Sequence, residues 1–290
     1  MGAPEAIASS LASGVLLGGI FALTALGLSL VLGVLRLVNL AHGDFLVVGA
    51  YAGFYLLTLT GIDPLLGLPL IASALAVLAA PLYRILVQPL AGRGAEAPMM
   101  TMFGVSVVLQ NLFVVAFSAN TRSIETAYST SSLTLGPVTV GWIYVVGFAI
   151  SVVTVVAVHL VVTGTSFGRD LRASAQDPVA AAVIGVDVGR VRMLTFAAGA
   201  ACAGAGGTLT GLAFSFTPSS GAGFLLNSFA VVVLGGLGNV LGTLVAGMAI
   251  GVLQSLGGVL LGDGYRDLVA LMLFLAVLMV RPQGLMSGSG

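Results

Sequence analysis

Long apolar runs without a charged side chain limit what this chain can fold into. Val140 to Val162 is one such run, and Leu268 to Val280 is another. A helix that crosses a bilayer needs about 20 such residues. The 290 residues are 58% hydrophobic and 7% charged, with a mean hydropathy of +1.15. Because an ordinary soluble domain is about 25% charged, we conclude that most of the surface of this protein faces lipid.

The length of the apolar segments indicates the fold class. Transmembrane β-strands have about 9–11 residues and alternate in polarity, and these segments are longer and do not alternate. The sequence therefore predicts an all-α integral membrane protein, with residues 1–290 forming a single transmembrane domain. The predicted spans are 7–35, 45–61, 64–84, 98–118, 140–162, 193–213, 223–240, 241–259 and 266–281.

Two of these spans leave the helix count open. The first is either one long tilted helix or a broken one, and the pair 223–259 is either two full spans or a shallow hairpin. We therefore expect about eight or nine transmembrane helices.

The arginines predict the orientation, because cytoplasmic loops collect basic residues. Alternating crossings place one group of arginines on the same side: Arg36, Arg84, Arg93, Arg169, Arg172, Arg190, Arg192 and Arg281. The opposite loops offer only Arg122. We expect the C-terminus to be cytoplasmic and, with nine spans, the N-terminus to be external.

The chain contains no lysine, since all ten basic residues are arginines. A P-loop needs its lysine on the nucleotide phosphates, so the chain is not expected to bind or hydrolyse ATP itself. His42 and Asp44 could resemble an acid–base pair, but no nucleophile or metal-ligand cluster accompanies them. The sequence indicates no catalytic residue, metal site or cofactor.

A polar stretch separates the first two predicted spans. Arg36, Asn39, His42 and Asp44 fall within nine positions, and the predicted orientation puts them on the cytoplasmic side. There Asp44 can cap the second helix, while Asn39, His42 and Gly43 can hold a tight turn. Three roles stay open for this stretch: a structural turn, a gate at the inner mouth, or a proton site.

Small residues recur at a spacing of four. The pairs are Gly14/Gly18, Gly49/Gly53, Gly207/Gly211, Gly238/Gly242 and Gly247/Gly251. In lipid such pairs let helix backbones approach closely, so they predict tight packing. The alternative is that thin walls let helices slide or line a passage.

The stretch "VLGGLGNVLG" predicts a broken helix. Gly235, Gly236, Gly238 and Gly242 surround Asn239, and each glycine weakens a helix by about 1 kcal/mol relative to alanine. A break at membrane depth is tolerated beside a cavity or transport path. A plain cytoplasmic turn is equally compatible with the pattern.

The loop 164–192 carries most of the remaining polar residues. Asp177 before Pro178 is a good helix start, and Gly185 can end the helix in a left-handed conformation. Ala180 and Ala181 lie between them. This short helix along the cytoplasmic face is either an ordinary connector or a docking element for a cytoplasmic partner.

Four motifs together resemble a known family. They are "GLSLVLGVLRLVNLAHGDFLVVGAY", "RASAQDPVAAAVIGVDVGRVRMLTF", "FAVVVLGGLGNVLGTLVAG" and "VRPQGL". They resemble the permease subunits of branched-chain (hydrophobic) amino-acid ABC importers, from about residue 27 to 285 and in the order found in the family. The order Asn39, Ala41, His42, Gly43, Asp44 is closer to the H-type subunit than to its M-type sister.

The resemblance implies an ABC importer permease fold in the plasma (inner) membrane. It also implies three kinds of partner chain: a second permease subunit, two cytoplasmic ATPase subunits that bind the ATP, and an external solute-binding protein. The loop 164–192 would be the coupling loop. The family pattern Glu-Ala-Ala-x-x-x-Gly is present as Val179-Ala180-Ala181 and Gly185, with valine in place of the acid.

The expected function is import of branched-chain or other small amino acids, or of a related small solute such as urea, an amide or an aromatic acid. The alternative is a stand-alone secondary transporter or channel. Ion coupling normally needs acidic or histidine side chains at mid-membrane. The centres of the predicted spans contain almost none, which disfavours the alternative.

Overall fold

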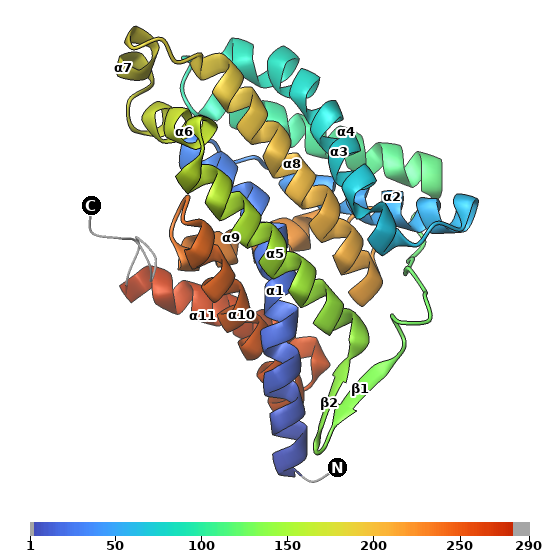
Figure 1. Cartoon of the computed structure of the whole chain (residues 1–290). Helices are drawn as coiled ribbons and strands as arrows, with labels where there is room; N and C mark the ends of the chain where they lie inside the picture. Colours follow the sequence, from blue (N-terminus) through green and yellow to red (C-terminus); the bar gives the residue numbers. More distant parts are fainter. Residues whose placement is uncertain (1–2, 281–290) are drawn as a thin grey trace.

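A computed structural model describes residues 3–280, and these are mainly helical (Figure 1). The α-helices are α1 (Ala3–Leu35), α2 (His42–Thr60), α3 (Pro64–Leu82), α4 (Glu96–Phe117), α5 (Trp142–Gly164), α6 (Ser166–Gln176), α7 (Pro178–Val183), α8 (Val188–Ala213), α9 (Gly221–Gly235), α10 (Val240–Leu261) and α11 (Arg266–Val280). A π-turn, η1 (Tyr83–Val87), and a 3₁₀ turn, η2 (Gln88–Leu90), extend α3, and a second 3₁₀ turn, η3 (Asp263–Tyr265), precedes α11.

The structure confirms the all-helical membrane fold. Seven helices are long and apolar enough to cross a bilayer: α1, α2, α3 with its extension, α4, α5, α8 and α10. The described parts of α9 and α11 add two apolar helices of 15 residues each. The predicted spans therefore correspond to real helices. Arg281 and the rest of the C-terminal motif lie outside the described residues.

The two ends of the helix bundle differ in charge. Arg36, Arg84, Arg190 and Arg192 surround two neighbouring cavities, and we call this the arginine-rich end. The other end carries the antiparallel hairpin β1 (Ser132–Leu135) and β2 (Val138–Gly141), in which Ser132 pairs with Gly141. We call it the hairpin end (Figure 1).

One further arginine lies at the hairpin end. Besides Arg122, this end carries Arg266, whose guanidinium lies 2.8 Å from the Asp263 carboxylate. Arg266 begins α11, and α10 runs antiparallel to α1, so the α10–α11 connection returns to the hairpin end. The predicted span 266–281 begins at the same residue, so the predicted loops do not include Arg266.

Helix α1 lies at the centre of the bundle and packs on α10 through glycine. A Cβ atom added at Gly247 would lie 2.5 Å from the carbonyl oxygen of Gly18, and one added at Gly14 would lie 2.6 Å from the Cα of Val252. The two backbones are thus in direct contact. The prediction of tight packing is confirmed for these glycines.

Helices α2 and α8 meet in the same way. A Cβ atom at Gly207 would overlap the carbonyl oxygen of Leu46, and one at Gly49 would overlap that of Gly204. The Thr208 hydroxyl donates a 2.9 Å hydrogen bond to the Gly49 carbonyl. Close backbone approach therefore brings α2 against α8 as well as α1 against α10.

Helix α9 is too short to cross a membrane. Its 15 residues extend about 22 Å, less than the hydrocarbon thickness of about 30 Å. The segment 223–259 is therefore neither two full spans nor a shallow hairpin. It is one short helix followed, after a turn, by the full-length α10.

The α1–α10 contact gives the first prediction. In Gly247→Val the added side chain has no space between two backbones, so we expect a loss of about 1–3 kcal/mol in stability. Thermal unfolding of the detergent-purified chain measures this loss. Gly104→Ala on α4 is the matched control, because no described atom lies within 4 Å of a Cβ placed there. Equal unfolding temperatures for the two variants would contradict the packing assigned to α1 and α10.

Candidate functional site

The segment between α1 and α2 returns into the protein. At Arg36 the backbone is left-handed, with a φ of 52°, and the chain reverses beside the end of α1. Leu37 and Asn39 are buried, at 4% and 2% exposure. The Asn39 side-chain oxygen accepts a 3.1 Å hydrogen bond from the Ala41 amide. Asn39 therefore stabilises a buried turn, in agreement with the turn predicted from the sequence.

His42 shows how deep this segment goes. Its Nε2–H donates a 2.8 Å hydrogen bond to the Thr24 carbonyl oxygen. Thr24 lies 11 residues before Leu35, the last residue of α1, which corresponds to about 17 Å of helix. Since the hydrocarbon core is about 30 Å thick, α2 begins near its middle. The predicted surface position is therefore wrong for His42 and Asp44, while Arg36 is exposed at the arginine-rich end.

Asp44 lies in the first turn of α2 and is 1% exposed. One of its carboxylate oxygens accepts a 3.1 Å hydrogen bond from the Gln110 amide of α4. The same amide donates to the Ser106 hydroxyl oxygen at 3.2 Å. The N-cap residue of α2 is Ala41, so the interpretation of Asp44 as the cap is wrong. Asp44 instead joins α2 to α4.

The N-terminus of α9 meets the N-terminus of α2 at this point. A Cβ atom at Gly43 would overlap the Gly221 carbonyl oxygen, and one at Gly221 would overlap the Asp44 carboxylate. Glycine at both positions lets the two helix ends touch. Because each N-terminus carries a partial positive charge, the Asp44 carboxylate stabilises both.

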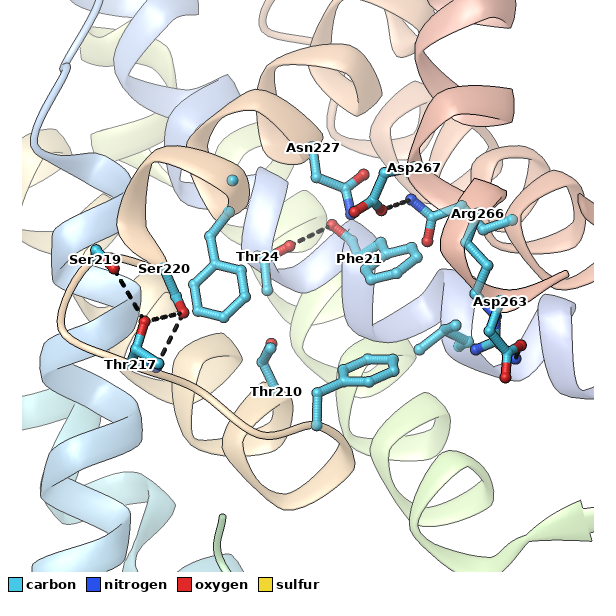
Figure 2. A pocket seen from close by; sticks show the side chains of 15 residues that line it. Phe21, Thr24, Thr210, Thr217, Ser219, Ser220, Asn227, Asp263, Arg266 and Asp267 are labelled. Carbon is cyan, nitrogen blue, oxygen red and sulfur yellow. Dashed lines mark hydrogen bonds and ion pairs between the residues drawn. The ribbon is translucent and has the colours of Figure 1, made fainter. Parts of the chain in front are cut away.

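A cavity of about 670 Å³ opens from this junction toward the hairpin end (Figure 2). Residues of α1, α8, α9, α10, η3 and α11 and the loop 214–220 line it. Such a volume is typical of small-molecule sites, which measure about 300–1,000 Å³. Among residues 3–280, no group of three or more His, Cys, Asp or Glu side chains could hold a metal ion.

The cavity has two polar ends, and Thr24 and Thr210 lie between them (Figure 2). At one end Thr217 and Ser220 lie before α9, with their hydroxyl oxygens 3.1 Å apart. At the other end Asp267 accepts a 3.4 Å hydrogen bond from the Gln254 amide. Phe21 lies between the two ends (Figure 2). The arrangement can bind a small amphipathic molecule with polar groups at one end of its frame.

The two ends differ in charge. The end at α11 holds two carboxylates, Asp263 and Asp267, and one guanidinium, Arg266. Since Arg266 is paired with Asp263 at 2.8 Å, one negative charge remains. The end at α9 is a helix N-terminus whose partial positive charge is already compensated by the Asp44 carboxylate. The cavity therefore favours a cationic group at its α11 end.

The short helix at the arginine-rich end forms as predicted. The Asp177 carboxylate accepts hydrogen bonds of 2.9 and 3.0 Å from the amides of Val179 and Ala180. Pro178 is the first residue of α7. Gly185 follows the helix with a φ of 92°. These residues define both ends of α7, which projects from the bundle (Figure 1).

The two faces of α7 differ in exposure. Ala181 is buried, at 2% exposure, so it packs inward. Val179, Val183 and Ile184 point outward and are 73%, 83% and 76% exposed. A helix that carries polar neighbours on both sides thus presents apolar side chains outward. We call these three residues the α7 apolar face.

The glycine-rich stretch is the turn between α9 and α10. Gly236 and Gly238 have φ values of 88° and 78°. Asn239 caps α10 by accepting a 2.8 Å hydrogen bond from the Gly242 amide, and a Cβ atom at Gly242 would overlap the Gly235 carbonyl oxygen.

This turn is close to the arginine-rich end. A Cβ atom at Gly33, two residues before the end of α1, would lie 2.6 Å from the Cα of Gly238. The plain-turn interpretation is therefore the one that the structure supports. The discontinuity at mid-depth lies instead at the other end of α9.

Several residues of the site were missed by sequence reasoning. They are Thr24, Ser106 and Gln110 around Asp44, and Asn227, Gln254 and Asp267 at the cavity. Gln110, Asn227 and Gln254 lie inside predicted spans. Polar side chains in such positions commonly mark function, so this signal was available in the sequence.

The helices are apolar and pack through glycine, α9 is too short to cross the membrane, and a cavity lies beside it. These features are typical of a membrane transport protein. The chain matches the family described as "Branched-chain amino acid transport system / permease component" over residues 10–278, and it belongs to this family. It is thus a multi-pass membrane permease, as the sequence motifs predicted.

Three relatives illustrate the similarity. The chain is 29% identical to the high-affinity branched-chain amino acid transport system permease protein BraD of Pseudomonas aeruginosa, covering 95% of this chain and 94% of BraD. It is 30% identical to the permease protein LivH of the corresponding Escherichia coli system, with 94% and 93% covered. It is 28% identical to a probable branched-chain amino acid transport permease protein LivH of Methanocaldococcus jannaschii, with 93% and 90% covered. No solved structure matched significantly.

The junction of α2, α4 and α9 gives the second prediction. Asp44→Ala leaves the Gln110 amide without its acceptor and removes the negative charge beside two helix N-termini, so we expect a loss of about 1–3 kcal/mol in stability. Asp44→Asn keeps an acceptor oxygen and is expected to lose less. Thermal unfolding and solute uptake are measured together, with the exposed Glu125→Ala as control. An Asp44→Asn protein of normal stability that transports no solute would instead indicate a proton site.

Proposed function

We propose that this chain is the permease subunit of an ATP-binding cassette importer that moves branched-chain or other small amino acids, or a related small solute. The observation that carries the proposal is the family match over residues 10–278. BraD and LivH are both named for branched-chain amino acid transport. The four sequence motifs support the same function.

The cavity supports an amino-acid solute. The α-ammonium suits the carboxylate of Asp267, because Arg266 is already paired with Asp263. Phe21, Phe214 and Phe224 provide an apolar surface for the side chain. The cavity thus offers a carboxylate and an apolar surface to an amino acid with an apolar side chain.

The α7 apolar face supports a cytoplasmic partner. Exposed apolar side chains at a water-facing end of a membrane protein mark an interaction surface. We propose that residues 164–192 form the coupling loop of a single permease domain of 1–290, and that α7 docks on an ATPase subunit. ATP then binds to two such partner subunits, and the chain itself carries no cofactor.

The remaining partners and the orientation follow from the same proposal. A second permease subunit, either an M-type sister or a second copy, completes the membrane part, and an external binding protein delivers the solute. The arginine-rich end faces the cytoplasm of the plasma (inner) membrane, in line with the excess of arginine there. Because α11 runs from the hairpin end toward this side, the C-terminus is cytoplasmic.

A lack of ionisable groups at mid-membrane no longer disfavours a secondary transporter. The span centres were expected to contain almost none, but His42 and Asp44 lie near mid-depth. Family membership, and not a lack of such groups, therefore favours the ATP-driven importer.

Docking through α7 gives the third prediction. Val183→Asp puts a charge into an apolar contact, and an unpaired buried charge costs several kcal/mol. We expect copurification of the ATPase subunits to fall more than about tenfold, the equivalent of 1.4 kcal/mol. Membrane insertion should stay normal, and Val183→Ala should retain most of the binding. Full copurification of the ATPases with Val183→Asp would exclude α7 as the docking element.

The charge pattern of the cavity gives the fourth prediction. Asp267→Asn keeps the oxygen that accepts from Gln254 and removes the negative charge. We expect uptake of leucine at limiting concentration to fall about tenfold, since hydrogen bonds to charged groups contribute roughly 1.5–3 kcal/mol. Glu125→Gln, an exposed acid at the same end of the bundle, is the control. Unchanged uptake by Asp267→Asn would remove this carboxylate from the solute path.

Purification with endogenous partners tests the function as a whole. Mass spectrometry should identify two ATPase subunits and a second permease subunit. ATP hydrolysis by the complex should increase when the binding protein and its solute are added. Nucleotide turnover by the isolated chain would contradict the assignment.

A further inference from the structure

A second cavity, of about 300 Å³, lies at the arginine-rich end. It is enclosed by the end of α1, the turns η1 and η2, the loop before α4, and the start of α8. It is separate from the solute cavity, with which it shares no lining residue. The function proposed above does not use it.

Two arginines, Arg36 and Arg192, are among the residues that line this cavity. None of its described lining residues is acidic. The Nε atom of Arg192 is buried and has no hydrogen-bond partner among the described residues. Arg36 uses one nitrogen to donate a 3.1 Å hydrogen bond to the Ala175 carbonyl oxygen. The cavity therefore contains positive charge and donor capacity that the described protein groups do not neutralise.

The neighbouring cavity provides a comparison. Arg84 and Arg190 line it together with Asp187. There a carboxylate of the chain balances part of the positive charge. Glu96, the acid closest in sequence to the α4 wall of the Arg36–Arg192 cavity, is exposed and does not line it. The Arg36–Arg192 cavity therefore lacks the carboxylate that its neighbour has.

The backbone beside the arginines also favours an anion. The wall contains Gly92 and Gly94, with φ values of 100° and 85°, followed by Ala95, the N-cap residue of α4. An alanine side chain cannot accept the hydrogen bonds of the first-turn amides. Such amides, together with the helix dipole, bind phosphate groups well, and arginine matches the geometry of phosphate oxygens.

The other walls are apolar. Leu35, Leu37 and Val87 line the cavity. Outside it, Ile85 on η1 and Met100 on α4 are 69% and 57% exposed, on segments that belong to membrane-spanning helices. A phosphate held by the arginines would therefore have lipid-facing surface beside it. Basic pockets between transmembrane helices on the cytoplasmic side bind anionic headgroups.

We propose that the cavity between α1, η1–η2, α4 and α8 binds the phosphate group of an anionic phospholipid through Arg36 and Arg192. The headgroup lies at the arginine-rich end, and the acyl chains follow the apolar surface next to Ile85 and Met100. A lipid bound at this site contacts the residues at the end of α1.

Native mass spectrometry of the full-length chain in mild detergent tests the site. The probes are dioleoyl phosphatidylglycerol, dioleoyl phosphatidylcholine and inorganic phosphate. We expect retention of one phosphatidylglycerol in preference to phosphatidylcholine. Each arginine near an anionic lipid contributes about a fivefold change in affinity. Arg36→Gln and Arg192→Gln should each weaken retention by about this factor, and the double variant by about 25-fold.

Two controls separate the site from general surface charge and from misfolding. Arg190→Gln removes one charge from the neighbouring cavity and should leave retention within about twofold, since Asp187 already balances that site. Arg36→Gly suits the left-handed backbone at this position, so it should fold normally and still lose affinity.

Three results would overturn the proposal. Equal retention of phosphatidylglycerol by the double variant would place the lipid elsewhere. Equal losses in Arg190→Gln and Arg192→Gln would reduce the effect to general surface charge. Displacement of the lipid by millimolar inorganic phosphate, with no preference between the two lipids, would make the cavity a site for a free phosphate.

Discussion

The carboxylate of Asp44, between two helix N-termini at mid-depth, is the interaction on which the arrangement of the helices depends. Each N-terminus carries a partial positive charge. The Asp44 carboxylate compensates both, while Gln110 fixes the carboxylate from α4. The cavity of about 670 Å³ lies on the N-terminal side of α9, where the loop 214–220 lines it.

The packing around α1 explains how such a junction can exist in a membrane. Glycine contacts bring α10 against α1 and α8 against α2 at backbone distance, so the apolar surfaces are satisfied without large side chains. The polar groups of residues 36–44 can then be buried inside protein, where the Thr24 and Asn39 oxygens accept their hydrogen bonds. A broken helix exposed to lipid would have no such acceptors.

Features set by residues close together in the sequence could be predicted, and features set by the path of the chain in the tertiary fold could not. The cap of α7 by Asp177 and the left-handed Gly185 follow from local hydrogen-bonding chemistry. The glycine pairs predicted close packing for the same reason. The depth of His42 could not be read in this way, because hydropathy treats any polar stretch between two apolar runs as a surface loop. The partner of Asp44, Gln110, lies 66 residues away in the chain, and only the tertiary fold brings them together.

The backbone contact between α1 and α10 also has a mechanical consequence. Two helices joined at glycine cannot slide past each other without forcing a side chain into a space that holds only hydrogen atoms, so they behave as one stiff strut. With 33 residues in α1, the strut is about 50 Å long. Its arginine-rich end is bonded to α6 through Arg36, and its other end contacts the hairpin, where the Ser9 hydroxyl oxygen accepts a hydrogen bond from the Thr139 amide. We therefore expect a displacement of α6 to move α1 and α10 together.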